Sequence, residues 1–579
     1  MVGTIQINDI DFTKYECIKD KYNRVVDGVN HGRAIYYDSN NKLYYKIFHP
    51  DYCRINNFRR AVKANFFEGV ASALTHLIYD QWNEIVGYVT KEGPILSPNE
   101  FDYQLIPKDF FRILKNKIKE CGMFFYDLVP HNIILIDGVP SLIDLESVYD
   151  INEYNLLSTH NAKIKPDYLH DYIQELWSST PMKISLIQPG RNNLKYLKWS
   201  YNSIRKNQGN HTVEICVADD FSNDGTWEWC LETMDKDPHF NAIKNNGPKR
   251  LGHTILYDRL VNEVAEHDIC MIYHADMYLC PGALDSIEKH LIDKTIVSLT
   301  RIEPPLHPPG PEKILVDFGI EPEEFDEPKL LRFLEDSKNE RIDKTTEGIF
   351  APWAFYKKDF QEIGGHDEIF APQSKEDTDI FNRFQLNGIK FVQTWEGCVY
   401  HMTCRGSRFA DGAKRNPDGQ VFMKNRETDE WLKQNQKSTR EFLRKWGHFC
   451  KHDSLMKPII PPKYDIGFVI TNANLSLIEA LEPWCANVYC DFNIAEYISK
   501  EDTSFNLNDK FKPLDNEKLN EILIQIDGSR FTQEDFGFIQ QISEIIEDSG
   551  DEGFHGEIGT LLIDIIKMNK YEDELIICK

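Results

Sequence analysis

Apolar and polar positions alternate in a regular pattern along the middle of the chain. From residue 184 an apolar, strand-like run, "ISLIQPG", leads to an amphipathic segment of helical length, "LKYLKWSYNSIRKNQ", and then to a second apolar run, "EICVADD". The alternation continues through "HDICMIYHAD" and, after the Pro-rich loop "EPPLHPPGPEK", through a second patterned block at about 348–408. Strands that alternate with helices predict a mostly parallel sheet with helices on its faces.

The regions on either side have different patterns. Before residue 178, strand-like runs such as "KLYYKIF" mix with helix-like ones such as "FFEGVASALTHLIYD", which predicts an α+β domain. "SSTPMK" and "MKPIIPPK" have the composition of linkers, and "YDIGFVITNANLSLIEALEPWCANVYCD" predicts a strand, a helix and a strand. We therefore predict an α/β multidomain protein with domains at 1–178, 183–455 and 456–579, the last being a small α/β module.

Length, charge and cysteine usage narrow the class of protein. A chain of 579 residues is too long for one hydrophobic core. Its formal net charge of −26 argues against nucleic acid or an anionic membrane surface as the main partner. The 13 cysteines lack a regular spacing, which indicates reduced thiols rather than a zinc site. No stretch approaches the ~18 apolar residues of a membrane span, and the N-terminus does not look like a signal peptide, so we expect a soluble, cytoplasmic protein.

Three strand ends of the central region are more polar than a turn requires. They are "QPGRNN" at 188–193, "VADDFSNDGT" at 217–226 and "HAD" at 274–276. A helix cap accounts for Asp224 or Thr226, but not for two adjacent aspartates ahead of them. Because ligands of parallel sheets bind at the carboxyl ends of the strands, these segments predict a ligand site.

The same segments resemble the nucleotide-binding half of the inverting GT-A glycosyltransferases of the family-two type. That family has Pro-x-x-Asn after one strand, Asp-Asp-x-Ser-x-Asp-Gly-Thr after the next and Asp-x-Asp after a later one. Downstream, "FQEIGGHDEIFAPQSKEDTDIFNRFQLNG" is similar to the family's Gly-Gly-Phe-Asp-Glu block, which is followed by Glu-Asp and a helix. The resemblance implies a Rossmann-like GT-A domain that transfers a sugar, with inversion, from a nucleotide-sugar to an acceptor hydroxyl. A UDP-sugar is the expected donor.

The resemblance places the donor nucleotide among these strand ends. Asp219 or Asp220 would hold its base or ribose. Lys249 or Arg250 would face the diphosphate, although a solvated basic turn explains the pair equally well. Trp353 would stack on a sugar face or simply fill the core. The other residues that the resemblance assigns to the donor pocket are Pro189, Arg191, Asn192, His274 and Ala275.

A divalent cation bridging the two phosphates would stabilise the departing nucleotide, and hard oxygen ligands suit Mg²⁺ or Mn²⁺. Asp276 stands at the metal-binding position of the Asp-x-Asp motif, and His401 ends a strand-like run where many GT-A enzymes place a metal-binding histidine. His274 replaces the first Asp, so it would contact the ribose or add a nitrogen ligand that favours Mn²⁺. Arg405, Ser407 and Arg408 of the next loop would clamp phosphate if that loop closes.

Single displacement also needs a base beside the acceptor hydroxyl. By resemblance the base is Asp377, with Glu376 next to it. Asp379 lies two residues further on and is the weaker candidate. All three are also residues that favour the first turn of a helix, which is the structural alternative.

The first domain resembles another family, the protein-kinase-like folds of small-molecule and lipopolysaccharide kinases. "FFYDLVPHNIILIDGVPSLIDLESVY" has the spacing of a catalytic loop and metal-binding Asp, and "YYKIF" carries a strand-borne lysine. A Gly-x-Gly-x-x-Gly loop is missing and few residues remain for a second lobe, so a kinase using ATP and Mg²⁺ and a non-catalytic scaffold both stay open. The residues of the implied site are Lys46, Glu68, Asp127, Asn132 and Asp144.

We thus expect a metal-dependent glycosyltransferase that acts on a glycan or glycosylated acceptor in glycan or polysaccharide synthesis. The alternatives are a protein whose main activity is phosphoryl transfer by the first domain, and a non-catalytic carbohydrate-binding assembly protein. The C-terminal module has helix-core spacing at Leu475, Ile478 and Leu481 but no acid and base set. We expect it to pack, to form a homo-oligomer or to present an acceptor.

Overall fold

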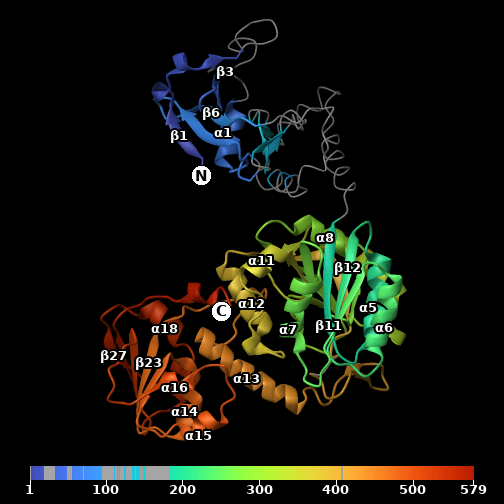
Figure 1. Cartoon of the computed structure of the whole chain (residues 1–579), viewed down its shortest axis with the longest axis vertical. Coiled ribbons are helices and arrows are strands. Elements are labelled where there is room, and N and C mark those ends of the chain that lie inside the picture. Colours follow the sequence, from blue (N-terminus) through green and yellow to red (C-terminus); the bar gives the residue numbers. More distant parts are fainter. Residues whose placement is uncertain are drawn as a thin grey trace. The chain divides into compact units, whose positions relative to one another are not determined.

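The computed structural model of the chain divides into two compact units, residues 1–181 and 182–579, which are described separately (Figure 1). In the first unit the structure describes residues 2–18, 33–48, 55–69 and 71–93, with short stretches between 110 and 150. In the second it describes residues 182–405 and 408–578. Among the described residues, no helix combines the length and the apolar composition needed to cross a membrane.

The first unit is built on a six-stranded sheet in the order β1-β5-β6-β4-β3-β2. Its pairs are antiparallel except for β1 with β5. One face packs against α1, whose buried Ile55, Phe58 and Ala61 recur at helical spacing. The elements are β1 (Gly3–Gln6), β2 (Glu16–Cys17), β3 (Arg33–Asp38), β4 (Leu43–Phe48), α1 (Ile55–Lys63), β5 (Leu74–Tyr79), β6 (Ile85–Lys91) and the strand pairs β7 (Met123–Phe125) with β10 (Val148–Asp150) and β8 (Ile133–Ile136) with β9 (Val139–Leu142).

Two residues of the predicted kinase-like site, Lys46 and Glu68, lie among the described residues. Lys46 is buried on β4, with its ammonium 5.6 Å from the centre of the Tyr88 ring. Glu68, its expected partner, lies beyond the end of α1 and forms an ion pair with Lys117 at 3.6 Å instead. The other three predicted residues, Asp127, Asn132 and Asp144, lie outside the described residues.

The second unit begins with a ten-stranded sheet whose main order is β13-β12-β11-β14-β19-β16-β20-β15, with β17 beside β16 and β18 beside β20. The first four strands of this order are parallel, as predicted, whereas β19 and β15 run antiparallel to their neighbours. The strands are β11 (Lys183–Gly190), β12 (Thr212–Asp219), β13 (Phe240–Lys244), β14 (Ile269–Ile272), β15 (Met277–Leu279), β16 (Thr295–Glu303), β17 (Lys313–Leu315), β18 (Thr345–Thr346), β19 (Trp353–Tyr356) and β20 (Lys390–His401).

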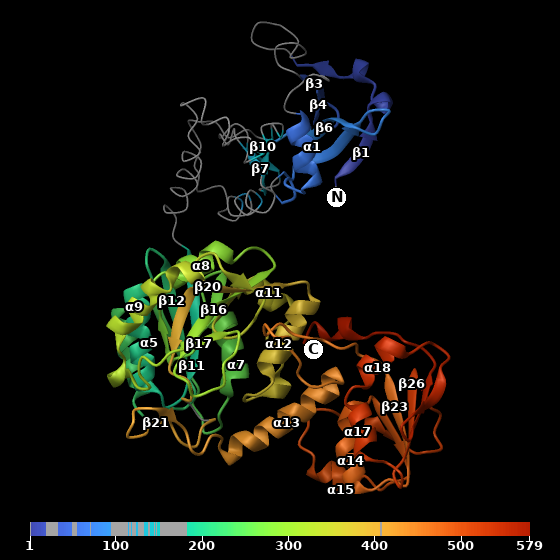
Figure 2. The same cartoon turned by 180° about the vertical axis from the view of Figure 1, so that it is seen from behind.

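Helices cover both faces of this sheet, and Figures 1 and 2 show α5 and α6 on one side of the strands and α7 and α12 on the other. Alternate residues of one strand enter opposite cores. On β11, Ile184 and Leu186 pack on the α5 side, and Ile187 packs on the α7 side. The helices are α5 (Leu194–Asn207), α6 (Thr226–Lys236), α7 (Gly252–Arg259), α8 (Ala283–His290), α9 (Glu327–Asp336), α10 (Lys338–Arg341), α11 (Lys357–Glu362) and α12 (Glu376–Leu386).

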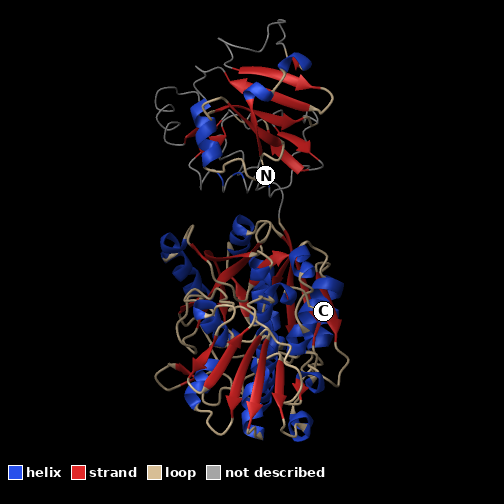
Figure 3. Ribbon diagram, turned by 90° about the vertical axis from the view of Figure 1, so that its left-hand side faces the viewer, coloured by secondary structure: helices blue, strands red, loops and turns tan. Residues whose placement is uncertain are grey.

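The C-terminal module has its own sheet, whose strands fan out at the bottom of Figure 3. The sheet has six strands in the order β25-β24-β23-β26-β28-β27. Its first strand, helix and second strand agree with the predicted pattern, and Ile478 and Leu481 of α14 are fully buried. The elements are β23 (Ile466–Thr471), α14 (Leu475–Leu481), β24 (Asn487–Cys490), α15 (Ala495–Lys500), α16 (Leu507–Lys510), β25 (Phe511–Lys512), β26 (Ile522–Asp527), α17 (Gln533–Ile539), α18 (Ile542–Ser549), β27 (His555–Ile558) and β28 (Leu561–Ile565).

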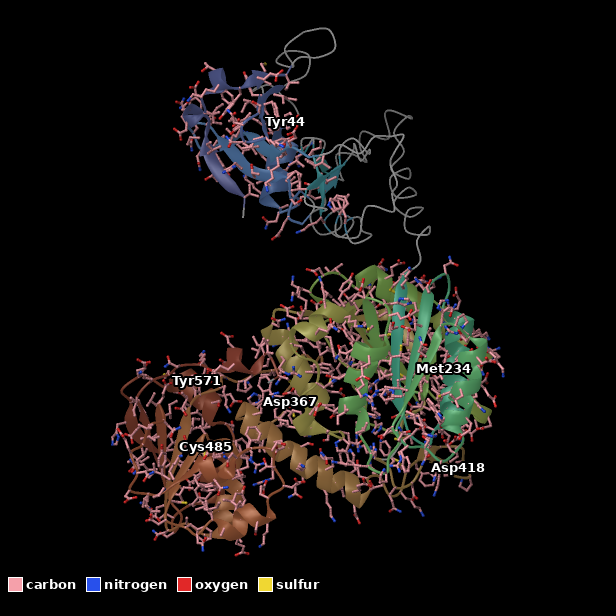
Figure 4. The ribbon with its side chains drawn as sticks, in the orientation of Figure 1. Tyr44, Met234, Asp367, Asp418, Cys485 and Tyr571 are labelled. Carbon is pink, nitrogen blue, oxygen red and sulfur yellow. The ribbon has the colours of Figure 1, made fainter. Side chains whose placement is uncertain are left out.

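A long helix, α13 (Asp429–Trp446), joins this module to the ten-stranded domain. Arg444 of α13 is buried and contacts two acidic residues of the module, Glu482 at 2.7 Å and Glu501 at 2.6 Å. On the other side, Lys445 forms ion pairs with Asp367, labelled in Figure 4, and with Asp379 of α12, both at 2.7 Å. Buried charged pairs with this many partners hold their elements in one arrangement, so α13 fixes the module to the part of the ten-stranded domain that contains Asp367 and α12.

Candidate functional site

A cavity of about 840 Å³ opens where several strands of the large sheet end. The strands β11, β12, β14, β16 and β20 each contribute their last residue or the residues just after it. All three polar strand ends singled out in the sequence reach this cavity, because β11 and β12 are parallel and in register, with Gly190 opposite Asp219. The charged and imidazole side chains that line it are Arg191, Asp220, Arg250, His253, His274, Asp276, Arg301, Glu303, His307, Lys313, Lys375, Glu376, Asp377, His401, Arg405 and Arg408.

The two adjacent aspartates after β12 have different environments. Asp220 lines the cavity and accepts hydrogen bonds from the backbone N–H groups of Leu251 (3.0 Å) and Gly252 (2.9 Å), and Arg250 lies 3.6 Å from it. Asp219 is fully buried below the cavity and accepts from the N–H of Ser222 at 3.1 Å. Of the two aspartates, Asp220 is therefore the one that lines the cavity. Asp219 holds the shape of the loop that follows β12.

The predicted residues at the end of β11 also differ in whether they line the cavity. Pro189 and Arg191 line the cavity, whereas Asn192 is absent from its lining. The Asn192 side-chain oxygen accepts from the N–H of Asn223 at 2.9 Å, and its own N–H donates to Ser222 Oγ at 2.9 Å. Asn192 thus ties two strand-end loops together from outside the cavity.

Three candidate metal ligands lie together at one wall. His274, Asp276 and His401 each offer one donor atom, and the three atoms lie within 4.8 Å of one another. The strand register explains the meeting, because Met277 of β15 pairs with His401 of β20 and so brings Asp276 beside that histidine. Asp276 Oδ1 is 3.3 Å from His401 Nε2. Two imidazole nitrogens and a carboxylate at this spacing fit a divalent metal ion such as Mn²⁺.

A residue that the sequence did not reveal orients His401. Glu303, the last residue of β16, accepts a hydrogen bond from His401 Nδ1 at 2.7 Å. That bond assigns the proton to Nδ1 and leaves Nε2 facing Asp276, as in most protein sites where a histidine binds a metal. Glu303 is itself held by Arg301 at 3.1 Å and Lys313 at 3.5 Å. Strand β16 is parallel to β20, with Ile302 opposite Tyr400, so only the register of the sheet places Glu303 next to His401.

The electrostatics of this wall favour a cation. Burial would lower the pKa of His401, but the charges of Asp276 and Glu303 and their hydrogen bonds outweigh burial and raise that pKa to about 9. Burial, with the nearby His401 charge, lowers the pKa of His274 to about 3, so His274 is neutral at pH 7. The field that holds a proton between the two carboxylates is also the field that would hold a metal ion.

Glu376 and Asp377 begin α12 and line the cavity. Glu376 is nearly buried, and its Oε2 has no hydrogen-bond partner among the described residues. Asp377 lies deep in the cavity but its side chain is open to the cavity solvent. Burial raises the pKa of both carboxyl groups, and the charge of Asp377 raises that of Glu376 further. The open carboxylate is the better placed of the two to meet a bound hydroxyl.

Asp379 has a structural role. It is fully buried and forms ion pairs with Arg383 at 2.8 Å and with Lys445, and it also accepts a hydrogen bond from Trp446 Nε1 at 2.9 Å. Every oxygen of Asp379 is engaged inside the protein, which agrees with its being the weaker candidate for a base.

Trp353 does not line the cavity. It is fully buried on β19, and its ring lies 4.7 Å from the ring of Phe355 and 5.6 Å from that of Phe381. Its place on a central strand, between β14 and β16, explains this burial. The sequence left two roles open for Trp353, a sugar-stacking residue and a core residue. The structure shows that Trp353 fills the core, so the prediction that it stacks on a sugar is wrong.

Several positively charged side chains also line the cavity. Arg250 lines it and reaches Gln373 at 3.3 Å, whereas Lys249 is exposed outside it. Arg405 and Arg408 follow His401 and also line the cavity. Arg301 and Lys313 were not predicted, because the Pro-rich segment around them matches no motif. The sequence offered one sign of this part of the site, which is the polar residue Glu303 at the end of a strand-like run.

Comparison with known proteins supports a glycosyltransferase in this part of the chain. Residues 185–363, which are fewer than half of the chain, match the model of the family described as glycosyl transferase family 2. No curated protein sequence matches the chain. The family match does not extend into the first unit, so the kinase-like domain stays a prediction.

Three solved structures give the extent of structural similarity. GalNAc-T7 with UDP, GalNAc and Mn²⁺ has 14% identity and a TM-score of 0.30, over 38% of this chain and 43% of the other. TarS residues 1–349 from S. aureus has 15% identity and a TM-score of 0.27, over 38% and 60%. The mannosyltransferase PcManGT from Pyrobaculum calidifontis with GDP-Man and Mn²⁺ has 13% identity and a TM-score of 0.27, over 41% and 64%. The chain thus spans less than two thirds of the length of each.

Proposed function

We propose that the protein is a metal-dependent glycosyltransferase that moves a sugar, with inversion, from a UDP-sugar to a hydroxyl of a glycan or glycosylated acceptor. The family match at residues 185–363 supports the reaction class. The observation that carries the proposal is the meeting of two functional groups in one cavity. The cluster of His274, Asp276 and His401 lies in the same cavity as the open carboxylate of Asp377.

Each group has a separate task in this reaction. His274, Asp276 and His401 would hold Mn²⁺ or Mg²⁺, which when bound neutralises charge on the leaving diphosphate. Asp377 takes the proton of the acceptor hydroxyl as its oxygen forms a bond to the anomeric carbon and the bond from that carbon to the nucleoside diphosphate breaks. A single displacement of this kind inverts the anomeric configuration.

Positive and polar side chains position the donor. Arg191 and Arg250 line the cavity beside Pro189, near the end of β11, and Asp220, just after β12, and this side is proposed for the nucleotide. Guanidinium groups bind phosphate oxygens through paired hydrogen bonds. The nucleotide side of the cavity thus offers the charge that a diphosphate needs, although the whole chain has a net charge of −26.

A panel of nucleotide-sugars tests the proposal. Release of nucleotide is measured for UDP- and GDP-sugars with Mn²⁺, with Mg²⁺ and with EDTA. We expect at least one UDP-sugar to be hydrolysed in Mn²⁺, and EDTA or the Asp276→Ala variant to abolish the release. If no nucleotide-sugar binds or reacts in Mn²⁺, the non-catalytic alternative replaces the proposal. Unchanged release in EDTA would contradict metal dependence.

A further inference from the structure

A second cavity, of about 420 Å³, adjoins the first and, apart from the shared Arg250, lies outside the metal and donor sites described above. The two cavities share Arg250, Gln373 and Trp431. The other residues around the second cavity come from the segment before α12, from α13 and from the end of α15, and they are Pro372, Glu430, Lys433, Gln434, Gln436, Lys437, Arg440, Lys500, Glu501 and Asp502. The cavity is therefore a groove between the catalytic domain and the C-terminal module, and we call it the α13 groove.

Both walls of the α13 groove are held firmly. Glu430, Lys433, Lys437 and Arg440 recur at three- and four-residue spacing and so share one face of α13. Across the groove, Arg440 bonds Glu501 at 2.6 Å and Lys437 bonds Asp502 at 2.8 Å. These pairs join the α13 wall to the wall formed by the C-terminal module.

The α13 wall is also tied to the segment that carries the proposed base. Gln434 Nε2 donates to the carbonyl of Ala371 at 3.3 Å, and Ser438 Oγ donates to that of Gln373 at 3.3 Å. Ser374 Oγ donates to Asn435 Oδ1 at 2.7 Å. This segment leads directly into Glu376 and Asp377, so a ligand in the groove is held in a fixed relation to the base.

The groove presents the chemistry of a carbohydrate site. The side chains of Glu430, Lys433 and Gln436 are exposed and form no side-chain hydrogen bond or ion pair with another described residue, although the Glu430 charge acts on nearby Arg250. They offer a carboxylate, an ammonium and an amide, which together donate and accept hydrogen bonds as sugar hydroxyls do. At the junction, Trp431 adds an aromatic ring, one face of which is covered by the Arg408 guanidinium at 4.3 Å. The volume lies within the ~300–1,000 Å³ usual for small-molecule ligand sites.

We propose that the α13 groove binds the acceptor, and that the acceptor is a saccharide chain. The terminal sugar lies in the first cavity with its hydroxyl at Asp377, and the sugars before it lie along α13 against the C-terminal module. This inference rests on the proposed glycosyltransferase function and adds to it the site that binds the acceptor and the preference for a chain of several sugars. It also gives the C-terminal module a task, since Lys500, Glu501 and Asp502 form one wall.

The test compares long and short acceptors. The probes are hexasaccharides of β-1,4-linked N-acetylglucosamine, β-1,4-linked xylose and α-1,4-linked glucose, each with its monosaccharide. The full-length protein is compared with the Lys433→Ala/Gln436→Ala variant, whose two positions line only the groove. Leu432→Ala on the same helix is the matched control, because Leu432 lines neither cavity.

We expect one hexasaccharide to bind the wild-type protein in calorimetry and to accept sugar. The double variant should weaken its binding and raise its KM by about tenfold, whereas monosaccharide KM, donor hydrolysis and the Leu432→Ala control stay unchanged. Equal effects on long and short acceptors, no binding of any hexasaccharide, or transfer to peptides in place of saccharides would overturn the inference. Absence of donor hydrolysis would overturn the proposed function instead, since calorimetric binding to the groove is measured without a donor.

Discussion

At the scale of single residues, the site depends on side chains that lie far apart in the sequence. Glu303 and His401 are 98 residues apart, yet their side chains form a 2.7 Å hydrogen bond. That bond gives His401 one tautomer and one orientation towards Asp276. Because Glu303 already orients the His401 imidazole, that side chain can bind a metal ion without losing further conformational freedom.

Replacing Glu303 with Gln should therefore weaken Mn²⁺ binding by about 10–100-fold, the usual effect of losing such a partner. The affinity is measured by electron paramagnetic resonance of free Mn²⁺ on the purified protein. Glu312→Gln is the matched control, because Glu312 contacts the same Arg301 and Lys313 but not His401. If both variants weakened Mn²⁺ binding equally, the effect would come from losing a negative charge near Arg301 and Lys313. It would then not come from losing the hydrogen bond to His401.

The raised pKa of Asp377 predicts a pH dependence. A base must be deprotonated, and burial makes Asp377 hold its proton to a higher pH than the ordinary aspartate value of about 3.9. Transfer should accordingly fall as the pH is lowered, with a midpoint above that value. The measurement is kcat/KM against pH, with Glu376→Gln as control. Loss of the acidic limb in Glu376→Gln would assign the titration to Glu376.

The residues of the site were predictable to different degrees. Asp276, His401 and Asp377 lie in motifs whose order identifies them, and the structure brings all three to one cavity. Glu303 lies in no motif, and only the register between β16 and β20 places it beside His401. Trp353 could not be assigned, because an aromatic residue on a strand suits the core and a sugar face equally well.

At the scale of elements, strand ends carry the proposed metal ligands and helix α12 carries the proposed base. The alternation of strands and helices predicted the parallel half of the sheet, since buried apolar runs determine it. The antiparallel strands β15 and β19 were not predictable, because their pairing depends on long-range register. Helix α12 is held from below by the ion pairs of Asp379.

Asp379→Asn should therefore destabilise the fold, by about 3–5 kcal/mol, since it leaves the buried cations Arg383 and Lys445 without a full partner. The free energy of unfolding is measured in urea. Glu496→Gln breaks an exposed pair with Lys500 on α15 and should cause no measurable change. A similarly small effect of Asp379→Asn would show that this buried pair does not anchor α12.

At the scale of the whole molecule, one unit contains the complete site. All residues that line the two cavities lie in the second unit, 182–579. The boundary between the two units falls between residues 181 and 182, within the segment "SSTPMK", whose composition predicted a linker. The close packing of α13 against the C-terminal module was not predictable. In the sequence, Arg444 of α13 and its partners Glu482 and Glu501 look like ordinary surface charges.

A chain reduced to residues 182–579 should keep Mn²⁺ binding and donor hydrolysis within about twofold of the full chain, because it retains every lining residue. Metal affinity and nucleotide release are measured on both forms, and circular dichroism checks that the shorter chain is folded. A folded but inactive shorter chain would show that the first unit takes part in the reaction.

The most direct test of the central claim is the Asp377→Asn variant, studied with a reactive nucleotide-sugar and Mn²⁺. Asparagine keeps the shape of the side chain but cannot take a proton. We predict that the variant binds the donor with unchanged Kd, measured by calorimetry, while kcat for transfer falls by about 10²–10⁴-fold. A variant that binds the donor and transfers sugar at the full rate would contradict the account.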